Sequence, residues 1–195
     1  GADVNATDND GRSSLMWAVR LSNTDTAKIL IEKGIDLNVR AKDGRSALMM
    51  AINYGEKGIA KLLIEKRVDL NVTDNDGWSS LMVAAFCGDT DTAKILIETG
   101  ADLNVQDKDG YSPLMRAIRY KKTDIAKLLI EKGADMNVRD KRGRSALMLA
   151  IHYSVTDIAK SLIEKGADLN LRDEDGYSAL MRAICGRETD VAKLL

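Results

Sequence analysis

The sequence predicts an all-α solenoid, in which helix-turn-helix units stack on one another and β-hairpin-like fingers connect them. The first observation is a glycine that recurs every 33 residues. Leu-Met pairs recur in the same phase, and each unit holds two short stretches of apolar residues at helical spacing. Because neither stretch could form a stable helix alone, the helices must bury their apolar faces against neighbouring units. The recurring glycines are Gly11, Gly44, Gly77, Gly110, Gly143 and Gly176.

The period divides the chain into whole repeats and one shorter repeat, which we expect to form a single domain over residues 1–195. Residues 1–7 have the sequence of the tail of a preceding repeat. Neither end shows the polar-faced repeat that caps such arrays, so we expect a fragment of a longer protein or an array without its caps. The expected repeats are 8–40, 41–73, 74–106, 107–139 and 140–172, followed by a truncated repeat, 173–195.

Residues 107–139 illustrate the first half of a unit. Asp107–Gly110 is expected to form a turn, in which the glycine can adopt a positive φ. Ser112 then suits the N-cap of a helix, and Pro113 suits its first helical position. The apolar face of this first helix is predicted to consist of Leu114, Ala117 and Ile118.

The second half of the unit is expected to begin near Thr123, as a capping hydroxyl, with Asp124 placed well against the helix dipole. Gly133 stands where a left-handed residue ends a helix, and residues 134–138 are expected to lead out as an extended finger. The apolar stripe of the second helix is predicted to be Ala126, Leu129 and Ile130. The recurring lysines of these second helices indicate a solvated outer face.

The repeat 41–73 departs from this pattern. Lys57-Gly58 replaces Thr-Asp at the start of its second helix, so we expect the cap to be lost. Arg67 follows that helix, where it must either take a left-handed φ or alter the C-terminal cap. The other whole repeats place Gly34, Gly100, Gly133 and Gly166 at this position.

A 33-residue unit with the patterns G-x-S-x-L-M-x-A and L-I-E-K-G-A-D-x-N resembles the ankyrin repeat, and the resemblance covers the whole chain. The family usually has histidine where this sequence has methionine. We expect the methionines to pack between repeats. They are Met16, Met49, Met82, Met115, Met148 and Met181.

Each finger also ends in an asparagine that, in ankyrin proteins, can be a substrate for an asparaginyl hydroxylase. We favour a structural role, in which the side chain bonds the finger backbone. These residues are Asn38, Asn71, Asn104, Asn137 and Asn170.

No pattern indicates catalysis, a cofactor or a metal site. His152 has no nucleophile or carboxylate suggested by a motif, and Cys87 and Cys185 lie three repeats apart, too far for one zinc ion. The Asp-x-Asp-Gly turns lack the glutamate of a calcium loop. The net charge of −1, the absence of long apolar runs and the two scattered cysteines favour a cytoplasmic protein without a membrane span.

The positions that vary between repeats gather the aromatic residues and most arginines, whereas lysine is absent from them. Counted from the turn aspartate, these are columns five, ten, thirteen and fourteen. Tyrosine, tryptophan and arginine dominate binding hot spots. The ankyrin resemblance implies that the columns line the concave face and the fingers. The predicted partner-binding residues are Arg12, Trp17, Arg45, Tyr54, Trp78, Phe86, Tyr111, Arg116, Arg119, Tyr120, Arg144, His152, Tyr153, Tyr177 and Arg182.

The first hypothesis is a protein-interaction scaffold whose groove binds a partner with an acidic or mixed-charge surface. The alternative is a sensor that grips an anionic ligand, such as an oligonucleotide, with the same side chains. Aspartates near the finger tips count against a long phosphate track. A designed binder is a third possibility, and the irregular repeats argue against it. In a purely structural reading, the aromatic residues shield the inner helices and the arginines solvate the groove.

Overall fold

The computed structural model describes residues 3–195, so residues 1 and 2 of the expected tail lie outside the described residues. The chain divides into two compact units, Gly1–Asp102 and Leu103–Leu195. The expectation of a single domain stays a prediction. The first unit contains α1 (Ser14–Arg20), α2 (Thr24–Glu32), α3 (Ala47–Asn53), α4 (Lys57–Glu65), α5 (Ser80–Cys87) and α6 (Thr90–Glu98). The second contains α7 (Pro113–Arg119), α8 (Thr123–Glu131), α9 (Ala146–His152), α10 (Thr156–Glu164), α11 (Ala179–Cys185) and α12 (Thr189–Ala192).

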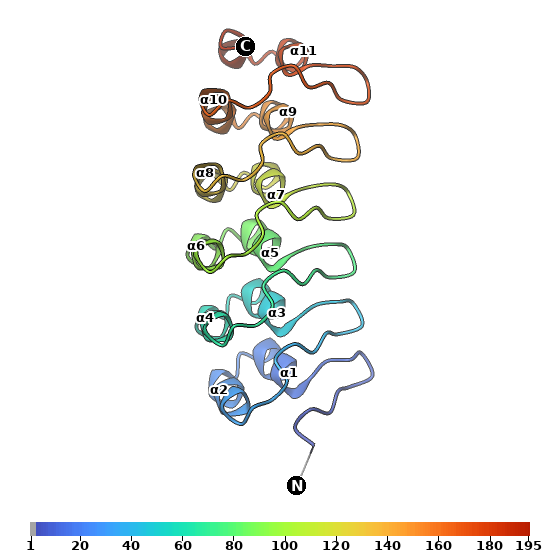
Figure 1. Cartoon of the computed structure of the whole chain (residues 1–195), viewed down its shortest axis with the longest axis vertical. Coiled ribbons are helices and arrows are strands. Elements are labelled where there is room, and N and C mark those ends of the chain that lie inside the picture. The colour runs from blue at the N-terminus through green and yellow to red at the C-terminus, as the bar shows by residue number, and fades with distance from the viewer. Residues whose placement is uncertain (1–2) are drawn as a thin grey trace. The chain divides into compact units, whose positions relative to one another are not determined.

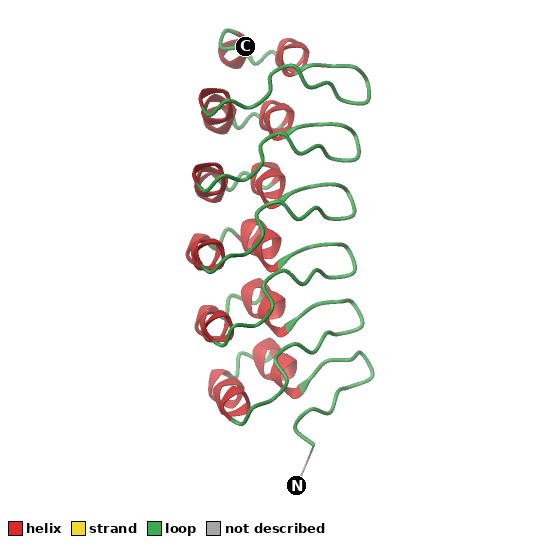
Figure 2. Ribbon diagram, viewed as in Figure 1, coloured by secondary structure: helices red, strands yellow, loops and turns green. Residues whose placement is uncertain are grey.

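Within each unit, equivalent helices of successive repeats pack together. In the first unit α3 contacts both α1 and α5, and in the second unit α9 contacts both α7 and α11. Figure 1 shows, in either unit, that the two helices of a repeat lie side by side and that a finger projects to one side of them. The expected all-α solenoid architecture is therefore confirmed. In Figure 2 the helices are joined by loops, and the described residues form only isolated bridges, such as Arg40–Ser46, in place of strands.

The first helix of each repeat begins as the sequence predicts. Ser112 accepts a hydrogen bond from the backbone amide of Met115, and Pro113 occupies the first turn of α7. The same serine cap precedes α1, α3, α5, α9 and α11. The expected packing role of the methionines is confirmed for five of them, which are at most 2% exposed, whereas Met181 in α11 is 43% exposed.

The second helices correct one expectation. Thr123 is the first residue of α8, so it is not the N-cap; that position is held by Lys122, which makes no side-chain capping bond. The loss of a cap at α4 is confirmed, since Glu56 precedes this helix without capping it. The lack of a side-chain cap is not peculiar to that repeat. Among the second helices, side-chain caps are made by Asn23 at α2 and Asp89 at α6, each of which accepts from a threonine amide.

The ends of the second helices agree with the sequence. Gly133 has a φ of 85°, in the left-handed region that glycine adopts without strain. Arg67 occupies the equivalent position with a φ of 59°. The first of the two expected outcomes is therefore correct: the arginine adopts the left-handed conformation.

The fingers are joined to each other inside each unit. In the second unit the Lys141 amide donates to the Asp109 carbonyl at 2.9 Å. Arg139 spans two neighbouring fingers, because its Nε donates to the Gly143 carbonyl at 3.0 Å and its Nη2 donates to the Arg172 carbonyl at 2.6 Å. In the first unit, Arg40 makes the corresponding pair of bonds to the carbonyls of Gly44 and Thr73.

The structural role of the finger asparagines is confirmed for Asn38, Asn71, Asn104 and Asn137, although the bonded backbone belongs to the next repeat. Asn38 Oδ1 accepts from the Asp69 amide at 3.4 Å, and Asn137 Oδ1 accepts from the Asp168 amide at 2.9 Å. Among residues 3–195, no helix is long and apolar enough to cross a membrane.

Candidate functional site

The turn that opens a repeat is organised by its aspartate side chain. Asp107 Oδ1 accepts hydrogen bonds from the amides of Asp109, at 2.9 Å, and Tyr111, at 3.0 Å. Asp107 Oδ2 accepts from Arg116 Nε, nine residues later in α7, at 2.5 Å. Asp107 and Arg116 are 6% and 5% exposed. Arg116, predicted to bind a partner, is thus buried in an ion pair that ties the turn to α7.

Two further repeats use the same pair of positions. Trp17 Nε1 donates to Asp8 Oδ2 at 2.9 Å, and Arg182 Nε donates to Asp173 Oδ2 at 2.7 Å. The pKa of Asp8 is lowered, chiefly by the hydrogen bond from the Arg12 amide. Burial by itself would raise the pKa of Asp173, but the bond from Arg182 and other hydrogen bonds outweigh burial and lower it. In these three repeats the tenth-column side chain therefore ties the opening turn to the first helix.

Tyr111 lies beneath three arginines. Its side chain is 3% exposed, and its hydroxyl accepts hydrogen bonds from Arg144 Nη2 at 2.6 Å and from Arg119 Nη1 at 3.1 Å. The Arg116 guanidinium carbon lies 4.5 Å from the ring centroid. Arg144 is also bonded to Asp140, through Nε at 2.8 Å. The hydroxyl of a buried tyrosine thus orients two arginines that belong to different repeats.

Arg119, at the end of α7, is exposed. Its Nη1 also contacts the Tyr153 hydroxyl, at 3.4 Å. Burial by itself would lower the pKa of Arg119, but the hydrogen bond to Tyr111 and the proximity of Tyr153 outweigh burial and raise it. Arg119 is therefore a permanent cation whose orientation is set by two phenol groups.

A depression of about 420 Å³ lies beside Arg119. It lies entirely within the second unit and is bounded by α7, α9 and the finger between them. We call it the second-unit groove, and it is lined by Asp109, Tyr111, Arg119, Asp140, Lys141, Arg142, Arg144, His152 and Tyr153. The structure therefore brings together five of the residues that the sequence analysis predicted.

His152 is exposed at the end of α9, where its ring meets Tyr153 edge-on at 4.8 Å between centroids. A smaller hollow of about 60 Å³ joins it to Arg142, Arg144 and Arg182. Partial burial is the largest cause of a lowered pKa for His152, and the positive charges of Arg144 and Arg182 follow. The neutral imidazole is therefore favoured at pH 7.

Sequence reasoning missed two cations of the second-unit groove, Lys141 and Arg142. Arg142 Nε donates to Glu174 at 2.7 Å, and this bond is the main cause of a raised pKa for Arg142. A signal was present in the sequence, because Arg142 stands in the third column. The other repeats carry an aspartate there: Asp10, Asp43, Asp76, Asp109 and Asp175.

In the first unit, Trp17 is 37% exposed and lies near two arginines, the predicted Arg12 and its neighbour Arg20. The guanidinium carbons of Arg12 and Arg20 lie 5.9 Å and 5.2 Å from its ring. Arg12 is also paired with Asp10, at 2.9 Å. This end of the unit presents an aromatic face with a positive border.

The other predicted residues of the first unit are aromatic apart from Arg45. Tyr54 and Phe86 are each 44% exposed, and Phe86 packs edge-on against Trp78 with 5.8 Å between ring centroids. Arg45 is exposed and lies 3.7 Å from Asp43. These side chains present apolar surface, in contrast to the charged lining of the second-unit groove.

Two predicted residues of the second unit lie outside the groove lining. Tyr120 is half-buried at the C-terminal cap of α7, directly after Arg119. Tyr177 is 37% exposed and lies under Arg182, whose guanidinium carbon is 4.5 Å from its ring centroid.

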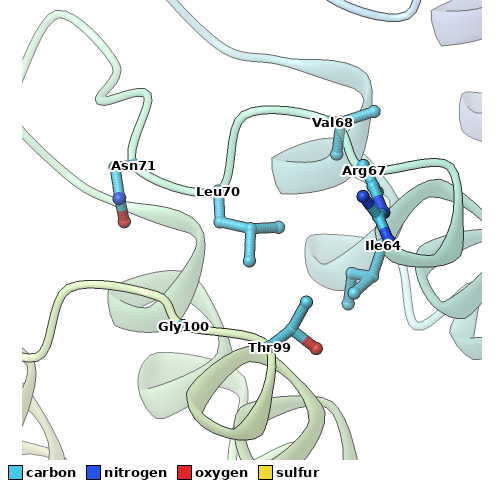
Figure 3. Close-up of a pocket in the computed structure, with 7 residues that line it drawn as sticks. All are labelled: Ile64, Arg67, Val68, Leu70, Asn71, Thr99 and Gly100. Carbon is cyan, nitrogen blue, oxygen red and sulfur yellow. The ribbon is translucent and has the colours of Figure 1, made fainter.

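Figure 3 shows a second depression, in the first unit, of about 450 Å³. Its residues belong to the ends of α4 and α6 and the segments that follow them, and none was predicted to bind a partner. Ile64, Val68 and Leu70 provide apolar lining, and Arg67, the residue with the left-handed backbone, lies beside them. Asn71, which also lines it, is already bonded through Oδ1 to the Asp102 amide at 2.9 Å.

Within residues 3–195, no group of three or more histidine, cysteine or carboxylate side chains could hold a metal ion. Repeated helix pairs and fingers that bond to each other define a helical repeat protein. The family model of the ankyrin repeats, in three copies, matches residues 1–74, 62–140 and 114–195. The chain belongs to the ankyrin repeat family, whose members are generally protein–protein interaction modules. A comparison with curated proteins gives no match.

Proposed function

We propose that this chain is a cytoplasmic, non-catalytic scaffold segment that binds another protein through the variable face of its fingers and first helices. In the second unit the proposed binding surface is the second-unit groove, and in the first unit it is formed by the exposed aromatic residues. One observation carries the proposal: Arg119 is oriented by Tyr111 and Tyr153 at the edge of the second-unit groove. An oriented arginine among aromatic side chains is typical of a binding hot spot.

The charges favour a partner with an acidic or mixed-charge surface. Lys141 and Arg119 supply positive charge at the groove, while Asp109 and Asp140 line it as well. A surface with both signs complements a protein better than a continuous phosphate backbone, which requires several neighbouring cations. For this reason we place the anionic oligonucleotide second.

The test begins with capture of partners by the 195-residue chain, with and without nuclease, and identification by mass spectrometry. The dissociation constant is then measured for the wild type and for two variants, Arg119→Ala in the groove and Tyr120→Ala directly beside it. Each should weaken binding by about 2 kcal/mol or more, as expected for central anchors. Lys127→Ala, on the exposed face of α8, is the matched control and should leave binding unchanged.

Salt dependence separates the two ligand classes. A single-stranded nucleic acid should give a log–log slope of about −0.7 per phosphate contacted, and loss of Arg119 should reduce that slope. A protein partner should show a shallower dependence, mostly in the association rate. Binding that survives both Arg119→Ala and Tyr120→Ala would remove the second-unit groove as the recognition site.

A further inference from the structure

The cations of the second-unit groove differ in whether they are already neutralised. Arg144 is paired with Asp140, and Arg142 is paired with Glu174, each at 2.7 Å. Arg119 bonds only phenol oxygens, and neither Arg119 nor Lys141 forms an ion pair with any carboxylate in the described part of the chain. Charge is therefore available at these two side chains.

The geometry of Arg119 leaves a specific edge available. Both hydrogen bonds to tyrosine use Nη1, at 3.1 Å to Tyr111 and 3.4 Å to Tyr153. The N–H groups of Nε and Nη2 have no bonded partner within residues 3–195. These two groups form one edge of the guanidinium fork, which matches the two oxygens of a carboxylate. Because the tyrosines already fix the side chain, little rotamer freedom is lost when that edge is occupied.

We propose that the free edge of Arg119 binds the side-chain carboxylate of an aspartate or glutamate of the partner protein, with Lys141 as the second cation of the site. This inference rests on the proposed function and specifies the chemistry that the second-unit groove recognises. His152 lines the same groove and senses the added negative charge.

A carboxylate fits this environment better than a phosphate. Asp109 and Asp140 also line the groove. Asp140 is neutralised by Arg144, whereas the Asp109 side chain is 71% exposed and shares Arg116 with Asp107, so part of its negative charge remains. A dianionic phosphate would be repelled by this remaining charge more strongly than a single carboxylate charge.

The experiment measures fluorescence anisotropy of three labelled decapeptides: five Glu-Ala pairs, the same peptide with glutamine for glutamate, and the same with phosphoserine. For the wild type, we expect the glutamate peptide to bind tenfold or more tightly than the glutamine peptide. Arg119→Gln should abolish that difference. Arg119→Lys should restore only part of it, because lysine keeps the charge and loses the fork. The control Lys127→Gln should behave as the wild type.

A second readout uses the only histidine of the chain. Saturation with the glutamate peptide should raise the pKa of His152, measured from its ring resonances by NMR, in the wild type and not in Arg119→Gln. The Arg119→Gln protein should fold, since Arg119 is exposed and the Tyr111 hydroxyl keeps its bond to Arg144. Far-UV circular dichroism verifies this.

Equal affinity for the glutamate and glutamine peptides would overturn the inference, as would wild-type discrimination by Arg119→Gln. Tighter binding of the phosphoserine peptide than of the glutamate peptide would show that the site recognises a phosphate and not a carboxylate. A natural partner that Arg119→Gln retains and Tyr120→Ala loses would leave the proposed function intact and remove the carboxylate site alone.

Discussion

The hydroxyl of Tyr111 accepts a 2.6 Å hydrogen bond from Arg144, which lies 33 residues later, one full repeat away. Because Asp140 holds the same arginine, the bond couples the turn of one repeat to that of the next. Tyr111→Phe removes the hydroxyl, so Arg144 keeps only its bonds to Asp140, and Arg119 keeps only its longer bond to Tyr153.

We therefore expect Tyr111→Phe to lower the free energy of unfolding by about 1–2 kcal/mol, measured by urea denaturation. Tyr177→Phe is the matched control in the same column, since its hydroxyl forms no hydrogen bond within residues 3–195 and the residue is 37% exposed. Equal stabilities of the two variants would show that the tyrosine–arginine bond contributes nothing net.

Two adjacent serines should respond in opposite ways to replacement by alanine. Ser79 caps α5 by accepting a hydrogen bond from Met82, whereas Ser80 Oγ is buried with no hydrogen-bond partner in the described structure. Ser80→Ala should stabilise the protein by about 1 kcal/mol, and Ser79→Ala should destabilise it by about 1 kcal/mol. Thermal or urea unfolding checks both, and a destabilising Ser80→Ala would reveal an unseen partner of that hydroxyl.

Arg67→Gly should stabilise the protein by about 0.5–1 kcal/mol, because glycine adopts the left-handed φ without strain. The reciprocal variant Gly133→Arg places the same side chain at the equivalent position of another repeat. A Cβ atom at Gly133 would meet no atom within 4 Å, so the cost should come mainly from backbone strain. Opposite changes in the unfolding midpoint are expected. A loss of stability in Arg67→Gly would mean that the arginine stabilises its surroundings.

His152 should titrate below the ordinary histidine value of about 6.5, and Arg182→Gln should move its pKa upward, because a nearby positive charge is removed. This lowered pKa also makes the stability of the protein depend on pH. Between its lowered folded pKa and the unfolded value, His152 binds fewer protons in the folded state, so the free energy of unfolding falls as the pH is lowered through that window. An NMR titration measures the pKa directly, and a value above 6.5 would contradict the expected direction.

The sequence predicts those features that repeat or that depend on local chain chemistry. The serine caps, the methionine packing, the asparagine bonds and the left-handed Arg67 follow from residue type and spacing. The predicted threonine cap of α8 was wrong by one residue. The start of a helix depends on backbone geometry, which a single threonine hydroxyl does not determine.

The candidate site is less predictable, since an arginine in a variable column can have either of two roles. Arg116 and Arg119 are three residues apart, yet one is buried on Asp107 and the other is exposed. That distinction depends on the direction in which each position of α7 faces relative to the turn. Lys141 was not among the predicted binding residues, because it lies outside the four columns from which they were taken. Only the path of the finger brings it to the groove.

The arginines that span two fingers have a mechanical consequence. If neighbouring fingers slide past each other, the Arg139 bonds to the Gly143 and Arg172 carbonyls must break together, because one rigid guanidinium makes both. Each such fork acts as a cross-brace, and shear between these fingers should be stiffer than the helix packing alone would give. A ligand that needs those fingers to move apart would work against this brace, whereas one that fits the existing spacing would not deform it.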